Sequence, residues 1–245
     1  ILESIGIEVA PSTDSFLDQM IGRFGLVFPK TAEFSAFARE TLTDIDCREA
    51  PDVALLAWME REEILFRTLE RHIIGDRLEK GFDREDIDSF MQFSLSVQNR
   101  RKSRVGQAFE HHTQELFVSH GIHFKRAAIT ENRAKPDFLF PGESEYHNPA
   151  FSTLDLTMLG VKSTCKDRWR QVLSEADRIE EKHLLTLETA ISQNQTAEMQ
   201  HKRLQLVLPR GLHCTYSAGQ QSWLLDVGGF VNIVRERQQR AGGLF

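Results

Sequence analysis

The chain has 245 residues, of which 40% are hydrophobic and 27% are charged, and its formal net charge is −6. This is ordinary globular composition, and the length suits one large domain or two small ones. No apolar run approaches the roughly 20 residues that a membrane span needs, so we expect no membrane partner. The three cysteines are widely spaced, which argues against a zinc site and favours a reduced, cytoplasmic setting.

The negative net charge at first argues against a nucleic-acid partner, but phosphates respond to the local field and not to the sum of charges. Residues 95–104 and residues 162–170 are locally basic. Their cationic residues are Arg100, Arg101, Lys102 and Arg104 in the first segment and Lys162, Lys166, Arg168 and Arg170 in the second. Taken alone, each run is also typical of a solvated helical face.

The first half of the chain is predicted to be helical. Apolar residues recur at helical intervals in five segments, at about 15–22, 30–42, 51–65, 83–95 and 103–119. Thr13 or Ser15 can cap the first helix, and Pro51 suits the first turn of the third. Gly121 ends the fifth helix.

After residue 121 the pattern changes to strands. The predicted strands are residues 122–129, 137–140, 152–164, 204–208 and 223–227. Residues 142–149 are turn-forming, residues 167–188 are predicted to form a strong helix, and residues 231–240 a polar one. We therefore expect an α/β fold: a central mixed β-sheet flanked by helices, with a helical N-terminal subdomain at 1–98 and the core at 99–245.

One set of polar residues lies on consecutive elements of this predicted core. Asp137 begins an apolar strand, Lys162 lies on the next convincing strand, and Glu175 lies within the helix that follows. Phosphodiester hydrolysis needs such a set, because two carboxylates can hold Mg²⁺, a hard ion that prefers oxygen ligands. An amine beside them can orient the attacking water and offset charge on the phosphate. The backbone carbonyl of Val161 could supply a further metal ligand.

The spacing alone leaves an alternative open, in which Asp137 is a turn residue and Lys162 and Glu175 form a surface ion pair. If residues 167–188 are helical, Glu175 falls on a polar stripe with Arg178 and Lys182, beside an apolar stripe that faces the core. Glu175 would then be reachable from a cleft above the sheet. This geometry favours the catalytic interpretation.

The segment from Leu159 to Glu175, with Asp137 upstream, resembles the catalytic domain of the EcoRII-type restriction endonucleases, which belong to the PD-(D/E)xK nuclease superfamily. The resemblance covers roughly residues 100–180 and is most specific between Lys162 and Glu175. It departs from the orthodox motif at Gly160, where most members have an acid. In the branch that recognises sites flanked by CC and GG, that acid lies on the following helix, where Glu175 stands.

The resemblance implies a restriction-endonuclease-like fold and Mg²⁺-dependent hydrolysis of DNA. Asp137 and Glu175 would bind Mg²⁺, and Lys162 would be the catalytic lysine. Glu110, on the helix before the first strand, would be the family's additional acid, and Gly106 one turn earlier would allow a close backbone approach. The alternative for Glu110 is an exposed helix residue.

The resemblance also implies how DNA is recognised. Lys166, Asp167 and Arg168 would contact bases, since Lys and Arg donate to guanine and Asp accepts from cytosine in the major groove. Asp167 is equally well placed to cap a helix. Members of this branch flip out central nucleotides, and Trp58 and Arg61 could line such a pocket, although a tryptophan at such a position is more often part of the core.

We therefore expect the catalytic domain of a type II restriction endonuclease that acts on double-stranded DNA as a homodimer, with residues 1–98 in the dimer and DNA interface. The start at Ile1 without a methionine suggests that a separate N-terminal DNA-binding regulatory domain, which relatives carry, is missing. The alternatives are a non-catalytic DNA-binding module of the same fold and a structure-specific nuclease such as a junction resolvase. A purely helical interaction protein would place the two carboxylates far apart.

Overall fold

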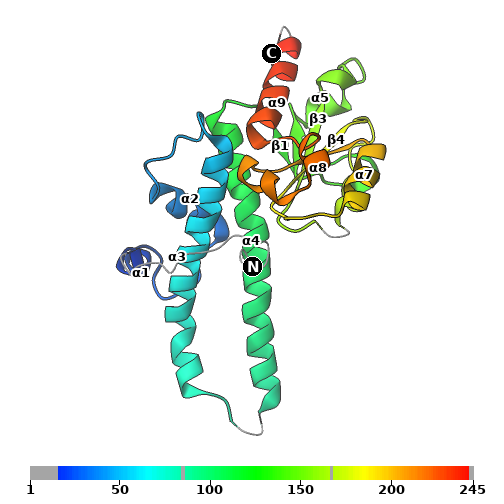
Figure 1. Cartoon of the computed structure of the whole chain (residues 1–245). Coiled ribbons are helices and arrows are strands. Elements are labelled where there is room, and N and C mark those ends of the chain that lie inside the picture. Colours follow the sequence, from blue (N-terminus) through cyan, green and yellow to red (C-terminus); the bar gives the residue numbers. More distant parts are fainter. Residues whose placement is uncertain (1–15, 84–85, 166–167, 243–245) are drawn as a thin grey trace. The chain divides into compact units, whose positions relative to one another are not determined.

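The structure is a computed structural model and describes residues 16–83, 86–165 and 168–242. The chain divides into two compact units (Figure 1): a helical unit from residues 1–44 and 57–112, and a sheet unit from residues 45–56 and 113–245. The expected boundary lay between residues 98 and 99. In the structure that position falls inside one continuous helix, α4 (Ile87–Ser119), and the division comes after His112.

The helical unit holds α1 (Leu17–Phe24), α2 (Thr31–Glu40) and most of α3 (Pro51–Lys80) and α4. The first three predicted helices are confirmed, and Pro51 is the first residue of α3. The predicted caps Thr13 and Ser15 lie outside the described residues. Apolar side chains from α1, α2 and α3 form the core of this unit: Met20, Phe34, Phe37, Ala38, Leu65, Phe66 and Leu69.

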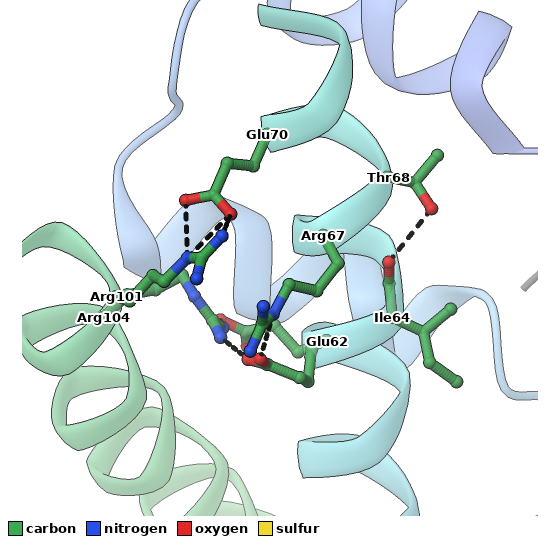
Figure 2. A network of polar contacts seen from close by, with 8 residues as sticks. Glu62, Ile64, Arg67, Thr68, Glu70, Arg101 and Arg104 are labelled. Atoms are coloured by element: carbon green, nitrogen blue, oxygen red, sulfur yellow. Dashed lines mark hydrogen bonds and ion pairs between the residues drawn. The ribbon is translucent and has the colours of Figure 1, made fainter. Parts of the chain in front are cut away.

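The fourth and fifth predicted helices are one helix, so the predicted break between them is wrong. The residues in between are polar and interrupt the apolar periodicity. Arg101 and Arg104 of α4 instead pair with acids of α3 (Figure 2). Arg101 Nε donates to Glu70 at 2.8 Å, and Arg104 pairs with Glu62 at 3.1 Å and with Glu63. Ion pairs with α3 stabilise the part of α4 that lacks an apolar stripe.

The sheet unit is built on five strands in the order β1-β2-β3-β4-β5. Neighbours are antiparallel from β1 to β3 and parallel from β3 to β5. The strands are β1 (Lys125–Arg126), β2 (Phe138–Phe140), β3 (Thr157–Lys162), β4 (Lys182–Thr186) and β5 (Leu204–Val207). The short helices between them are α5 (Glu143–His147), α6 (Trp169–Val172), α7 (Gln193–His201) and α8 (Ala218–Gln221), and α9 (Val227–Ala241) follows. The expected α/β fold, a mixed sheet flanked by helices, is confirmed.

Two predicted elements of the sheet unit are wrong. Residues 167–188 are not one helix, because α6 ends at Val172 and Ala176 has a φ of 52°, which a right-handed helix does not accept. Residues 182–186 form β4, which has a strand on each side and is buried throughout, and a short apolar run of this kind fits a buried helix equally well. Residues 223–227 are not a strand, since only Leu225 makes an isolated bridge, to Val207.

Helices cover both faces of this sheet. On one face, Phe117 from the end of α4 and Phe230 of α9 pack against Phe140 of β2, with ring centroids 5.1 and 5.8 Å from that of Phe140. On the other face, α6 places Val172 over Gly160 of β3. Alternate residues of β3 therefore serve different layers, and Met158, Gly160 and Lys162 share the α6 face. None of the helices among the described residues has the length and apolar character of a membrane-spanning segment.

Candidate active site

Asp137 and Lys162 meet where β2 begins and β3 ends. The antiparallel register places Asp137 across from Gly160. The N–H of Val161, one residue further, lies beyond the first residue of β2, and the Asp137 carboxylate accepts its hydrogen bond at 2.6 Å. The same oxygen, Oδ2, accepts from Lys162 Nζ at 2.6 Å, and the two side chains are only 17% and 21% exposed. Strands β2 and β3 thus hold the carboxylate and the ammonium in one hydrogen-bonded pair.

Glu175 approaches this pair from the turn that follows α6. Its side-chain oxygen Oε2 is buried and has no hydrogen-bond partner among the described residues. Burial and the negative charge of Asp137 raise the pKa of Glu175 to about 7, while Lys162 and Lys182 act in the opposite direction. The structure therefore brings the three predicted side chains together, although a turn and not a helix carries Glu175.

Gly160 explains why the second acid comes from outside the strand. A Cβ at this position would lie 2.8 Å from Cγ2 of Val172, because α6 packs directly on the sheet here. A strand carboxylate at residue 160, as in the orthodox motif, would collide with α6. Glu175, three residues beyond Val172, approaches the pair from the helix layer instead.

The donor set suits a hard divalent cation. Asp137 and Glu175 offer carboxylate oxygens, and the backbone carbonyl of Val161 could add a third oxygen, which is the chemistry that Mg²⁺ prefers. The unpartnered buried oxygen of Glu175 is an atom that a cation would satisfy. Within the described ranges, no group of three or more His, Cys, Asp or Glu side chains could hold a metal ion. A metal here would therefore rely on two carboxylates, a carbonyl and water.

Glu110 and Gly106 lie on α4 in the helical unit. Glu110 is half-buried and interacts with other residues. A Cβ at Gly106 would meet no atom within 4 Å outside the helix backbone beside it. Within the described ranges, no other part of the chain makes the close approach expected at Gly106.

Trp58 and Arg61 also belong to the helical unit, and the structure gives them separate neighbours. Trp58 is 5% exposed and packs against His112, with ring centroids 5.7 Å apart, and under the guanidinium of Arg39. The guanidinium of Arg61 lies over the ring of Phe16. Trp58 is therefore a core residue, which was the alternative to a flipped-base pocket.

Of the three residues expected to read DNA bases, Lys166 and Asp167 lie outside the described residues. Arg168 is exposed and stands directly before α6, and its backbone N–H donates to the carbonyl of Cys165 at 2.8 Å. Cys165 N in turn donates to Glu188 Oε2 at 2.9 Å. Arg168 is thus hydrogen-bonded to Cys165, which is itself hydrogen-bonded to Glu188 in the loop after β4.

Sequence reasoning missed the residues that hold the Glu175 turn. Lys182 was placed on the polar stripe of a helix, but it is the first residue of β4, 7% exposed, and its ammonium donates to two carbonyls of the turn. Thr130 and Tyr146 contact the same turn. The available signal was a lysine directly before the apolar run 183–187, which has the length of a buried strand.

Comparisons with known proteins identify the family of this chain. The family described as EcoRII C terminal matches residues 66–231. The chain is 38% identical over 234 residues to the type II restriction enzyme EcoRII of Escherichia coli, covering 94% of this chain but 56% of that protein. The chain thus spans little more than half the length of that relative.

Two solved structures share the fold. Metal-depleted Ecl18kI in complex with uncleaved, modified DNA has a TM-score of 0.74 at 17% identity, covering 97% of this chain and 88% of that one. A PspGI–substrate DNA complex has a TM-score of 0.69 at 16% identity, covering 87% and 94%. At these identities the likeness shows the restriction-endonuclease-like fold, and the family match and the Escherichia coli relative show more: this chain belongs to the EcoRII C-terminal family.

Proposed function

We propose that this chain is the Mg²⁺-dependent catalytic domain of a type II restriction endonuclease, which hydrolyses phosphodiester bonds of double-stranded DNA. The observation that carries the proposal is the meeting of Asp137, Lys162 and Glu175 on the α6 face of the sheet, with an unsatisfied carboxylate oxygen among them. A non-catalytic DNA-binding module would have no use for a buried, destabilising carboxylate pair. We place the enzyme in the cytoplasm as part of the same proposal.

Each residue of the cluster has a distinct role in this proposal. Asp137 and Glu175, with the carbonyl of Val161, would hold Mg²⁺, which when bound would supply Lewis-acid chemistry at the scissile phosphate. Lys162 directs its ammonium beside the metal-binding carboxylates, where it orients the attacking water and offsets charge on the phosphate oxygens. Asp137 fixes both Lys162 and the backbone of Val161. Glu175 binds metal in its ionised form, so a pKa near 7 makes metal binding sensitive to pH.

We further propose a short, near-palindromic recognition site flanked by CC and GG, read by Lys166, Asp167 and Arg168. Arg168, which stands exposed at the start of α6, can donate to a guanine in the major groove. A near-palindrome needs a two-fold symmetric reader, so the chain would act as a homodimer. The helical N-terminal part would contribute to the dimer and DNA interface.

Two parts of the proposal rest on the family resemblance. Glu110 would be an additional acid of the site, and an N-terminal DNA-binding regulatory domain would precede this chain in the full-length enzyme. The match to 56% of the Escherichia coli relative leaves room for such a domain. We do not extend the proposal to a flipped-base pocket at Trp58 and Arg61, because Trp58 is packed in the core.

The test is cleavage of a plasmid of known sequence in Mg²⁺ and in EDTA, with mapping of any cut ends. We expect discrete Mg²⁺-dependent fragments that share CC and GG ends, and no fragments with Lys162→Ala. Lys202→Ala, which removes an exposed lysine just after α7, is the matched control and should cut like the wild type.

The other outcomes separate the alternatives. Specific binding of the plasmid without cleavage would identify a non-catalytic module. Cleavage that follows DNA structure and not sequence would identify a structure-specific nuclease. A chain that neither cuts nor binds DNA would contradict the proposal altogether.

A further inference from the structure

Glu175 stands on a turn whose own backbone hydrogen bonds are few: its N–H donates to the Val172 carbonyl at 3.2 Å, and no helix continues beyond it. Helix α6 has four residues and ends at Val172, and residues 173–181 form turns and bends. Within this segment the N–H of Ile179 donates to the Ala176 carbonyl at 2.9 Å, and Ala176 has a φ of 52°. A metal-binding carboxylate on such a turn needs ties to the rest of the fold, because ligand position governs affinity.

Lys182, the first residue of β4, holds this turn by hydrogen bonds from its side chain. Its ammonium Nζ donates to the carbonyl of Ala176 at 3.0 Å and to the carbonyl of Ile179 at 2.6 Å. These two carbonyls bracket the turn that follows Glu175. Lys182 is 7% exposed, and a buried ammonium is costly unless its donors are used. The two carbonyls of the turn use the donors of this ammonium and so offset that cost.

Three more side chains hold the turn by its N–H groups. Thr130 Oγ1 accepts from Ala176 N at 3.4 Å, Glu131 Oε2 accepts from Asp177 N at 3.1 Å, and Tyr146 Oη accepts from Arg178 N at 3.3 Å. Thr130 and Glu131 come from the loop that leads to β2, and Tyr146 comes from α5. Lys182 differs from these three residues because it alone of the four belongs to a strand paired with β3 and binds the carbonyls of the turn.

The strand pairing links Lys182 to the other half of the site. Strand β4 is the parallel neighbour of β3, in a register that pairs Leu159 with His183 and Lys162 with Thr186. Lys162 and Lys182 therefore project on the same face of the sheet from two hydrogen-bonded strands. A rigid path runs from the strand that carries Lys162, through β4, to the turn that carries Glu175.

We infer that Lys182 is a positioning residue that sets the place of the Glu175 carboxylate relative to Asp137 and so sets the affinity for the divalent cation. The inference rests on the proposed function, because it takes Glu175 as a metal ligand. In this inference Lys182 acts through the Glu175 turn, whose carbonyls its ammonium binds, and not by contact with metal or DNA. Its removal should therefore weaken metal binding while leaving the DNA surface and the ammonium of Lys162 in place.

The test compares wild type with Lys182→Met, which keeps the length of the side chain and removes its donors. Mg²⁺ binding is measured by calorimetry, and single-turnover cleavage of a plasmid is measured over a range of Mg²⁺ concentrations. We expect the half-saturating Mg²⁺ concentration to rise about tenfold or more. The rate at saturating Mg²⁺ should fall by less than about threefold, and plasmid binding in EDTA should stay within about twofold, which general loss of structure would not produce.

Two further variants make the result decisive. Val234→Ala removes buried side-chain volume from α9, on the other face of the sheet, and lowers stability without touching the Glu175 turn. It should leave the Mg²⁺ dependence unchanged. Lys182→Arg retains donors and charge and should keep most of the metal affinity. Lys182→Gln, which shortens and neutralises the side chain, replaces the Met variant if that protein does not fold.

The outcomes distinguish this inference from the proposed function. An unchanged Mg²⁺ requirement in Lys182→Met, or an equal rise in Val234→Ala, would overturn the role of Lys182 while wild-type cleavage upheld the proposed function. An Arg variant that folds but binds Mg²⁺ as poorly as the Met variant would also overturn it. A wild type that binds Mg²⁺ without cutting any DNA would instead remove the proposed function and leave the calorimetric test of Lys182 valid.

Discussion

The helical unit and the sheet unit both bury acids beside cations, but they balance them differently. In the helical unit, Glu62, Glu63 and Glu70 of α3 face Arg101 and Arg104 of α4 (Figure 2). In the sheet unit, two carboxylates, those of Asp137 and Glu175, converge on the single ammonium of Lys162.

The pKa values of the buried acids differ between the two units: that of Glu62 is lowered and that of Glu175 is raised. Burial alone would raise the pKa of Glu62, but the hydrogen bond from His112 and the charge of Arg104 outweigh burial and hold it below its ordinary value. Burial and Asp137 instead raise the pKa of Glu175 to about 7. Charges that are matched inside the fold stabilise it only if the set stays complete. A buried carboxylate without a matching cation, such as Glu175, is typical of a site that binds a metal ion or substrate.

The largest expected effect is on catalysis. Asp137→Asn removes a metal-binding charge and the acceptor that fixes Lys162, so the single-turnover rate in Mg²⁺ should fall by about 10³-fold. The midpoint of urea unfolding should change little, since the carboxylate repulsion is relieved. Asp18→Asn, on the exposed face of α1, is the control and should cut at the wild-type rate. A rate within tenfold of wild type would show that Asp137 is not part of the active site.

In the helical unit we expect a loss of stability without a change in the Mg²⁺ requirement of cleavage. Arg104→Met leaves Glu62 buried without its arginine and Glu63 with Arg67 alone, and should lower the free energy of unfolding by about 3–5 kcal/mol. Urea unfolding measures this change, and Arg23→Met, which breaks the exposed pair with Glu40, should leave the midpoint unchanged. Protein that remains folded should need the same Mg²⁺ concentration for cleavage. Equal stability of Arg104→Met and wild type would mean that the ion pairs do not hold α3 to α4.

The sequence patterns predicted the helices of the N-terminal half best, because each carries an apolar stripe of helical period. They failed where another interaction replaced apolar packing. The polar stretch before Arg104 is helical because of its ion pairs with α3, which no local pattern reveals. The run 182–186 is buried on both faces, and its polar and apolar residues do not alternate, so it gave no period with which to separate strand from helix.

The three central residues of the candidate site lie near one another and their roles stay a prediction, whereas one element expected to carry them is wrong. Asp137, Lys162 and Glu175 come together although the helix expected to present Glu175 is a four-residue helix and a turn. The spacing of the motif indicates which residues should lie close together, but more than one backbone conformation is compatible with that spacing. The hydrogen bonds that fix one path, such as those of Lys182, come from residues distant in the chain and have no local signature.

A smaller effect tests how closely α6 must approach the sheet. Gly160→Ala adds a methyl group 2.8 Å from Val172 and should cost about 1–3 kcal/mol while displacing the turn that carries Glu175. Gly106→Ala is the matched control, since its methyl group meets no atom of the chain, and alanine should stabilise α4 by about 1 kcal/mol. The urea midpoint should therefore fall, and the half-saturating Mg²⁺ concentration should rise, for Gly160→Ala but not for Gly106→Ala. A Gly160→Ala protein with wild-type metal affinity would break the link between α6 packing and the Glu175 position.

The smallest expected effect isolates the unmatched charge itself. The folded protein without metal holds the Glu175 proton more tightly than the unfolded chain, because the pKa rises from 4.5 to about 7. The stability contributed by this group is complete below pH 4.5 and is lost as the pH rises through 7. Glu175→Gln cannot ionise, so its melting temperature in EDTA should equal that of wild type at pH 4.5 and exceed it by roughly 2–4 °C at pH 8.

Mg²⁺ should reverse that order, because a ligand that binds only the folded state stabilises it. At pH 8, Mg²⁺ should raise the melting temperature of the wild type and leave that of Glu175→Gln unchanged. Glu180→Gln, an exposed neighbour on the same turn, should behave like the wild type in both conditions. A Gln variant less stable than wild type at pH 8 in EDTA would mean that Glu175 is matched in the folded protein, and the contrast between the two units would fail at its central residue.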